Sequence, residues 1–156
     1  MGSLSYSHLW QDPQHTYMAS GTYVVTLTVI SVNGCEDMTS QVVEVYESPL
    51  ADFEYTEPNC EGDSTYFYDL SLPGSGNITS WYWDLGDGST STMANPVHLY
   101  AAGGTYQVIL NITDENGCSS SVMQEVFVNP RPLADFSYST ISCDTVSFTD
   151  QSVGSG

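Results

Sequence analysis

The stretch WYWDLGDGSTSTMANPVHLYAAGGTYQVILNITDENG, residues 81–117, decides the fold class. Every second residue from Tyr106 to Ile112 is aromatic or aliphatic, which is typical of a strand with one face in a core. Asn116-Gly117 follows this strand, and Asn-Gly is the strongest short signal for a hairpin. No segment of the chain combines helical periodicity with caps. The stretch therefore predicts antiparallel β-structure.

The pattern recurs at an offset of 83 residues along the chain. Three pairs of segments match: GTYVVTLTVISVNGC (21–35) with GTYQVILNITDENGC (104–118), DPQHTY (12–17) with NPVHLY (95–100), and PLADFEY (49–55) with PLADFSY (132–138). Fixed-offset similarity is the signature of a repeat architecture. Short strands separated by turn signals at this spacing predict antiparallel β-sandwiches that follow one another in tandem.

The motifs within residues 50–131 resemble the PKD domain, an immunoglobulin-like sandwich found in tandem on extracellular proteins. The resemblance rests on Trp83 to Gly88, on Asn95 to Tyr100 and on Gly104 to Leu110, with Leu85 where the family usually has Phe. It implies a structural motif made of Trp83, Asp84, Gly86, Asp87, Gly88, Pro96, His98 and Tyr100. In the incomplete first copy the matching residues are Trp10, Pro13, His15 and Tyr17.

Aligning the copies divides the chain into three parts. Residues 50–131 form one complete domain, residues 1–49 match its strands C to G, and residues 132–156 match its strands A and B. Three explanations remain open: a fragment of a longer tandem array, one repeating unit of a filament, or a polymer in which each chain completes the split repeat of its neighbour. The last two predict head-to-tail continuity between copies.

Two side-chain sets raise the question of chemistry. Asp84 and Asp87 could bind structural Ca²⁺, but they lack the alternating ligands of an EF-hand loop, and a tight Asp-Gly turn is the alternative. His98 and His15 occupy equivalent positions, which favours a packed histidine that hydrogen-bonds the corner before the next strand. No nucleophile accompanies them, so we expect no enzyme activity and no cofactor apart from that Ca²⁺. Trp83 is the predicted core tryptophan of strand C.

Four cysteines, Cys35, Cys60, Cys118 and Cys143, are disulfide candidates. In an immunoglobulin-like sandwich, Cys60 and Cys118 would lie at opposite ends. A bridge across the junction between successive units is therefore one hypothesis, with Cys60 meeting Cys35 of the following molecule and Cys118 meeting Cys143 of the preceding one. A bridge within one domain is the other. Asn77 and Asn111 begin Asn-x-Thr sequons and are glycosylation candidates.

The charge excludes several classes of partner. The chain has 19 acidic residues and one basic residue, Arg131, for a net charge of −18. Such a surface repels phosphate backbones and anionic lipids, so we expect no nucleic acid. No run of apolar residues is long enough to span a bilayer, so we expect no membrane insertion.

The sequence thus predicts a non-catalytic structural protein of the extracellular space or cell surface. We expect it to assemble head to tail with copies of itself into a fibre or filament, with an adhesion or surface role and surface polysaccharide as a further candidate partner. The alternative is a spacer or carbohydrate-binding accessory module of a secreted hydrolase.

Overall fold

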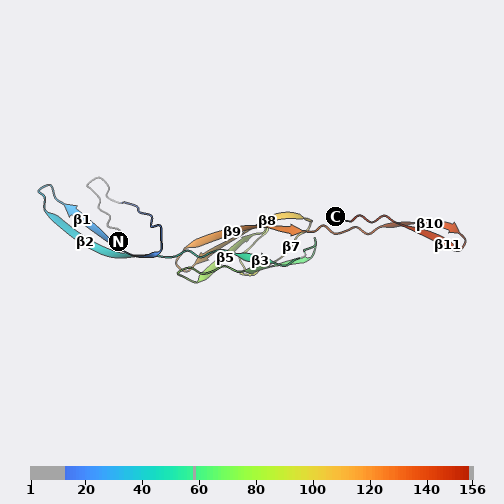
Figure 1. Ribbon diagram of the computed structural model, residues 1–156, viewed down its shortest axis with the longest axis horizontal. Helices are drawn as coiled ribbons and strands as arrows, with labels where there is room; N and C mark the ends of the chain where they lie inside the picture. The colour runs from blue at the N-terminus through green and yellow to red at the C-terminus, as the bar shows by residue number, and fades with distance from the viewer. Residues whose placement is uncertain (1–12, 58, 155–156) are drawn as a thin grey trace.

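The protein is described by a computed structural model that covers residues 13–57 and 59–154. Within these residues there are eleven strands and no helix, and all the paired strands are antiparallel. The prediction of an all-β, antiparallel fold is therefore confirmed. A sandwich lies in the middle of the molecule, and a two-stranded hairpin extends from each of its ends (Figure 1).

The central sandwich consists of two sheets. The first sheet has the order β3 (Phe53–Tyr55), β4 (Ser64–Asp69), β7 (Val97–Leu99). The second has the order β6 (Thr90–Ser91), β5 (Ile78–Asp84), β8 (Gly104–Asp114), β9 (Ser119–Val128).

The core forms where the inner faces of these two sheets meet. Val108, Leu110 and Ile112 are buried on β8, as their alternation predicts. Trp83 is also fully buried, and its ring lies 5.1 Å from the ring of Phe53 on the opposite sheet. The indole Nε1 of Trp83 donates a hydrogen bond to the carbonyl of Met93, so its polar atom is satisfied. Trp83 is thus the core tryptophan that the sequence predicted.

The N-terminal hairpin pairs β1 (Gly21–Ile30) with β2 (Glu36–Val45), in the register of β8 with β9. Gly21 faces Val45 as Gly104 faces Val128, and every pair along the hairpin keeps the offset of 83. The turn glycines, Gly34 and Gly117, have φ of +79° and +83°. Positive φ explains why glycine follows asparagine in both turns.

The C-terminal hairpin pairs β10 (Phe136–Ser142) with β11 (Thr145–Asp150), in the register of β3 with β4. Phe136 faces Asp150 as Phe53 faces Asp69. An isolated bridge between Leu133 and Val153 extends the hairpin, as a bridge between Leu50 and Leu72 extends the central pair. The segment 4–10, predicted as a further strand C with Trp10, lies outside the described residues.

Candidate functional site

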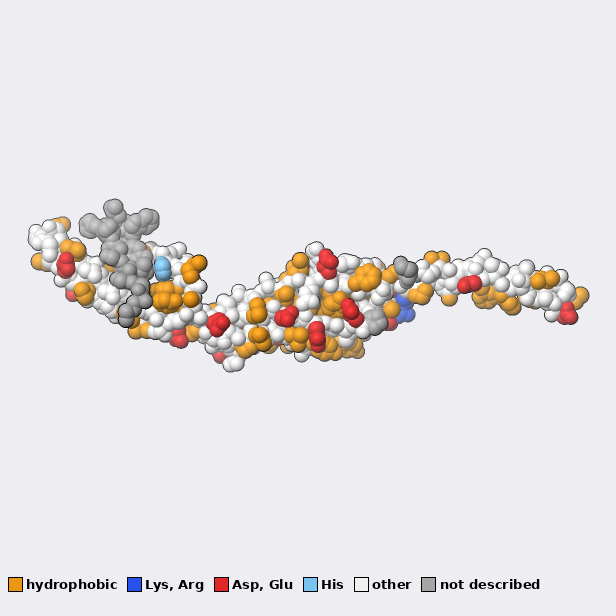
Figure 2. Space-filling view, viewed as in Figure 1, with side chains coloured by type: hydrophobic (Ala, Val, Ile, Leu, Met, Phe, Trp, Pro, Cys, Tyr) orange, Lys and Arg blue, Asp and Glu red, His pale blue; other side chains and the backbone are white. Residues whose placement is uncertain are grey.

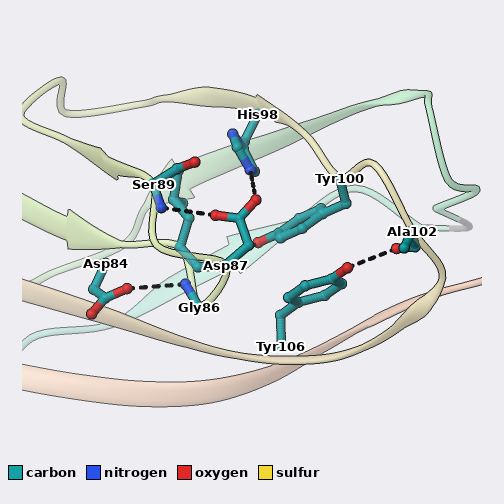
Figure 3. Close-up of polar contacts among 9 residues, drawn as sticks. Asp84, Gly86, Asp87, Ser89, His98, Tyr100, Ala102 and Tyr106 are labelled. Carbon is teal, nitrogen blue, oxygen red and sulfur yellow. Dashed lines mark hydrogen bonds and ion pairs between the residues drawn. The ribbon is translucent and has the colours of Figure 1, made fainter.

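The Asp-Gly turn after β5 is built by backbone hydrogen bonds and two glycines. The amide of Leu85 donates to the carbonyl of Ser89 at 3.0 Å, and the amide of Gly86 donates to Oδ1 of Asp84 at 3.0 Å (Figure 3). Gly86 has φ of +81°, and a Cβ atom there would lie 2.6 Å from the carbonyl oxygen of Gln107. Both the left-handed backbone and the close approach to β8 therefore require glycine.

Asp87 joins this turn to β7. Its Oδ2 lies 2.7 Å from Nε2 of His98, and its Oδ1 accepts a hydrogen bond from the amide of Ser89 at 2.9 Å (Figure 3). Partial burial raises the pKa of Asp87, but the hydrogen bonds from His98 and Ser89 outweigh it and leave the pKa below its usual value. The predicted corner contact of His98 is therefore corrected, because the hydrogen-bond partner belongs to the Asp-Gly turn.

Tyr100 connects the Asp-Gly turn to His98 and Tyr106. Its hydroxyl donates to the carbonyl of Leu85 at 2.9 Å, and burial raises the pKa of this phenol. Its ring meets His98 edge-on at 4.6 Å and stacks on Tyr106 at 4.1 Å. The Tyr106 hydroxyl in turn donates to the carbonyl of Ala102 at 2.7 Å (Figure 3). These contacts fix the entry of the chain into β8.

The aromatic half of this site recurs beside β1. His15 meets Tyr17 edge-on at 4.6 Å, and Tyr17 lies 4.2 Å from Tyr23. The Tyr23 hydroxyl donates to the carbonyl of Ala19 at 2.8 Å, as Tyr106 does to Ala102. Pro13 precedes this cluster outside any strand. The ring contacts of His15, Tyr17 and Tyr23 thus match those of His98, Tyr100 and Tyr106.

The two carboxylates of the Asp-Gly turn have separate partners. The carboxylate of Asp84 turns to the amide of Gly86, whereas that of Asp87 turns to Ser89 and His98, so the two do not converge (Figure 3). Among the described residues, no group of three or more His, Cys, Asp or Glu side chains is placed to hold a metal. The structure therefore favours the tight-turn interpretation, and Ca²⁺ binding at Asp84 and Asp87 remains an untested prediction.

The cysteines mark the two ends of the central sandwich. The backbone of Cys60 forms an isolated β-bridge with Asn129, which follows the end of β9. Cys118, by contrast, directly precedes the start of β9. Ten residues of strand span about 33 Å. A disulfide needs Cα atoms within about 7 Å, so Cys60 and Cys118 of one unit cannot pair. None of the four cysteines is paired in this structure, and Cys35 and Cys143 are exposed.

The two sequons lie on the surface of the central sandwich. Asn111 is exposed on the outward face of β8, opposite Tyr82 of β5. Asn77 is exposed before β5, and its amide groups donate to Oε1 of Glu115 at 3.0 and 3.2 Å. Both side chains are therefore accessible for the predicted glycosylation, which remains a prediction.

Two polar contacts were missed by sequence reasoning. The indole of Trp81 donates to Oδ2 of Asp69 at 2.6 Å, which ties β5 to the opposite sheet. Arg131 donates to the carbonyl of Glu61 and pairs with Asp63, which fastens the outgoing linker. Since Arg131 is the sole basic residue in a chain with 19 acidic ones, its isolation in the sequence was the available signal.

Comparison with known proteins assigns the family. The family model for the PKD domain matches residues 46–128, which include the whole central sandwich. The chain belongs to the PKD domain family. The Asp-Gly turn, His98 and Tyr100 thus lie inside a PKD domain, as the resemblance of the motifs predicted.

Several known proteins are similar to this chain. Pre-pro-metalloprotease PrtV of Vibrio cholerae serotype O1 (strain M66-2) is 37% identical over 64% of this chain and 11% of its own length. Collagenase ColA of Bacillus cereus is 42% identical over 41% of this chain and 7% of its own length. The crystal structure of the PKD1 domain of Epp from Vibrio anguillarum superimposes with a TM-score of 0.50 and 27% identity, over 54% of this chain and 96% of that domain.

The chain thus spans about a tenth of the length of these curated relatives. The part that it matches is the module and not the whole enzyme. In the described residues no helix is both long and apolar enough to cross a bilayer.

Proposed function

We propose that this chain is a non-catalytic structural segment of an extracellular protein built from PKD units in tandem. One observation carries the proposal: the strand register and turn hydrogen bonds of the central unit recur on both sides of it. The 83-residue offset between β1–β2 and β8–β9 holds for every residue pair, and β10–β11 repeats β3–β4. Such a recurrence is expected of consecutive copies of one structural unit.

The proposed mechanism is mechanical. The chain enters and leaves the central unit at opposite ends, so successive units line up along one axis (Figure 1). The incoming linker is fastened because the amide of Glu47 donates to Oγ of Ser75 at 2.8 Å, and the amide of Ser75 donates to the Glu47 carbonyl at 3.0 Å. Arg131 fastens the outgoing linker. Units joined in this way hold distance between their ends.

The motif residues support a structural role. Asp84, Asp87, His98 and Tyr100 are all engaged in hydrogen bonds that shape the turn. The net charge of −18 favours a solvated surface over contact with anionic partners. We place the protein outside the cell, where an end-to-end array would serve as a fibre or filament with an adhesion or surface role. Surface polysaccharide is a candidate ligand for such a fibre.

A second candidate is favoured by the relatives. Because a metalloprotease and a collagenase each contain a segment similar to this chain, this chain could serve as a spacer or carbohydrate-binding accessory module of a secreted hydrolase. A catalytic domain on the same polypeptide would favour this candidate, whereas further PKD units on both sides would favour the tandem array.

Small-angle X-ray scattering of the dilute chain tests the mechanical proposal. We expect an elongated particle in which the central sandwich keeps both hairpins apart, because both linkers are fastened by hydrogen bonds. A compact particle with the hairpins folded onto the central unit would contradict the spacer role. The same sample, incubated with polysaccharides in a pull-down, separates a carbohydrate-binding module from a pure spacer.

A further inference from the structure

The C-terminal hairpin exposes residues that correspond to the core of the central unit. Phe53 and Phe67 are 2% and 1% exposed, whereas their counterparts Phe136 and Phe148 are 63% and 69% exposed. The two rings of the hairpin lie 5.9 Å apart on one face. Hydrophobic side chains are visible along this hairpin in Figure 2. Within the described residues, nothing covers this face.

The N-terminal hairpin exposes the complementary part of the same core. Leu110 is fully buried on β8, whereas its counterpart Leu27 on β1 is 56% exposed. Ile112 is likewise buried, and its counterpart Val29 is 53% exposed. In the central unit these β8 side chains pack in one cluster with Phe53 and Phe67. The two hairpins therefore carry the two sides of one sandwich core.

The hairpins already have the backbone geometry of the complete sandwich. The amide of Asp135 donates to Oγ of Ser152 at 3.1 Å, and this Oγ donates to the carbonyl of Asp135 at 3.2 Å. The same pair of bonds, at the same two distances, joins Asp52 and Ser71 in the central unit. In these bonds the C-terminal hairpin already matches the corresponding part of the complete sandwich, and the N-terminal hairpin matches it in strand register.

A third element points to the same assembly. In the central unit, β7 pairs with β4, and His98 faces Thr65. The counterpart of β7, residues 14–16, forms no strand. Its pairing partner by equivalence is β11, where Val146 corresponds to Thr65, and β11 lies in the other hairpin. Residues 14–16 thus correspond in position to a strand but lack the edge that would pair with it.

The two hairpins of one chain cannot meet. They extend from opposite ends of the central unit, which is about 33 Å long along β9 (Figure 1). The linkers are a few residues each and are fastened by Ser75 and Arg131. The two complementary faces of one chain therefore cannot contact each other.

We propose that the occupant of each exposed face is a second copy of this chain. The β10–β11 hairpin of one copy packs onto the β1–β2 hairpin of the next, and β11 pairs with residues 14–16 of that copy. This rebuilds the split PKD unit and leaves one free hairpin at each end, so the association is head-to-tail and open-ended. The inference rests on the proposed tandem array and identifies the contact between its members. We call this contact the joint: β10–β11 of one copy against β1–β2 and residues 14–16 of the next.

Complementation between two variants tests this joint. Phe148→Glu disables the C-terminal hairpin, and Leu27→Glu disables the N-terminal one. In sedimentation velocity or light scattering, the wild-type chain is expected to form concentration-dependent oligomers, and each variant alone is expected to stay monomeric. Mixed, the two variants retain one working joint and are expected to form a 1:1 heterodimer and nothing larger.

Phe127→Glu is the matched control. Phe127 is also an exposed aromatic residue, but it lies on the outward face of β9, and its replacement is expected to leave the oligomers unchanged. A wild-type chain that is monomeric at every concentration would overturn the joint, as would a mixture that grows beyond the heterodimer. Because the scattering test of the tandem array uses the dilute chain or the Phe148→Glu monomer, it succeeds or fails independently of the joint.

The joint also predicts which cysteines meet. Cys60 lies at the outgoing end of the central unit, and the rebuilt unit that follows would present Cys35 of the next copy at its near end. By the same geometry, Cys143 would meet Cys118 of that next copy. Oxidised glutathione supplies the chemistry: two cysteine thiols lose two electrons and two protons to form one disulfide, and the reagent is reduced to two glutathione molecules.

Mass spectrometry of the oxidised heterodimer is expected to show only cross-links between chains. From its one working joint these are Cys60 with Cys35 and Cys143 with Cys118. Cys35→Ser removes the first cross-link and should leave the second. The four cysteines at the two disabled ends, Cys35 and Cys118 of the Leu27→Glu chain and Cys60 and Cys143 of the Phe148→Glu chain, are expected to form no cross-link. Any other pairing, or the absence of both cross-links at the working joint, would overturn this end-to-end arrangement.

Discussion

At the scale of single residues, the motif of this PKD domain is a set of backbone constraints. Asp87, His98 and Tyr100 link the turn after β5 to the segment that enters β8. A charge-assisted hydrogen bond is stronger than a neutral one, and burying an unpaired polar group is costly. These physical effects explain why such polar residues stand together in a domain whose role we propose to be structural.

Replacing Asp87 should weaken the fold and change its pH dependence. We expect Asp87→Asn to lower the free energy of unfolding by about 1–2 kcal/mol at neutral pH, because the charged partner of His98 is lost. The folded-state pKa of Asp87 lies below its usual value, so its contribution is present above about pH 4 and is lost as the pH falls through the folded pKa. Urea unfolding between pH 7 and pH 2 measures both effects.

The control for this prediction is Glu54→Gln, an exposed carboxylate on β3, which should change stability little. If Asp87→Asn and the wild type lose stability in parallel on acidification, Asp87 does not supply the pH dependence.

The two turn glycines offer a matched pair of variants. Gly86 and Gly88 have φ of +81° and +91°, so alanine is strained at both positions, by about 1–2 kcal/mol. An added Cβ at Gly86 would also lie 2.6 Å from the backbone of Gln107, whereas at Gly88 nothing lies within 4 Å. We therefore expect Gly86→Ala to destabilise clearly more than Gly88→Ala in urea unfolding. Equal losses would show that the close approach to β8 does not matter.

At the scale of elements, the two hairpins differ from the core strands in how their apolar faces are covered. β8 and β9 are covered by the opposite sheet, whereas β1–β2 and β10–β11 have one apolar face in solvent. A two-stranded hairpin alone is at best marginally stable in water. The hairpins therefore depend on whatever covers those faces.

Hydrogen exchange should reveal this difference. In the Phe148→Glu monomer, amides of β1 and β10 are expected to exchange much faster than those of β8, because hairpins open locally at low cost. In the 1:1 mixture with Leu27→Glu, exchange should slow in β1–β2 of the Phe148→Glu chain and not in its β10–β11. Equal protection of β1 and β8 in the monomer would contradict the dependence of the hairpins on a partner.

The outgoing linker provides a separate prediction. Arg131→Ala should lower the free energy of unfolding by less than about 1 kcal/mol, because the ion pair with Asp63 is more than half exposed. The linker should nevertheless loosen, since the hydrogen bond to the Glu61 carbonyl is lost. Faster amide exchange at residues 129, 131 and 133, and a broader distance distribution in scattering, measure that loosening. Arg131→Lys, which keeps the charge but lacks the guanidinium fork, is expected to restore little of the order.

At the scale of the whole molecule, net charge and shape have opposite effects on the association of copies of this chain. The elongated arrangement leaves both hairpins open to a second copy, whereas a net charge of −18 makes copies repel. Added salt screens that repulsion over about 10 Å at 0.1 M. We therefore expect association of the wild-type chain to strengthen as salt rises, measured by sedimentation at fixed protein concentration. Weakening with salt would indicate attraction between charges in place of an apolar joint.

Much of this fold was predictable because local chemistry and burial agree. Alternation along β8 predicted which side chains are buried, and Asn116-Gly117 predicted the turn that follows, since glycine supplies the positive φ. Trp83 was predictable as the core tryptophan because the incomplete copy has a tryptophan, Trp10, at the position equivalent to Trp83. At the position equivalent to Trp81 it has His8 instead. The contact of His98 with Asp87 was not predictable, since the two residues are eleven positions apart with β6 between them, and only the folded path brings them together.

The sequence by itself determined the all-β class, the PKD motif and the 83-residue correspondence between copies, because strand period, turn residues and repeats are local properties of the chain. Only the tertiary structure decided the partner of His98 and the contacts of Arg131 with Glu61 and Asp63. It also decided that the two complementary hairpins stand on opposite ends of the central unit. Burial and proximity depend on how distant segments pack, and no local pattern specifies which face is left without a partner.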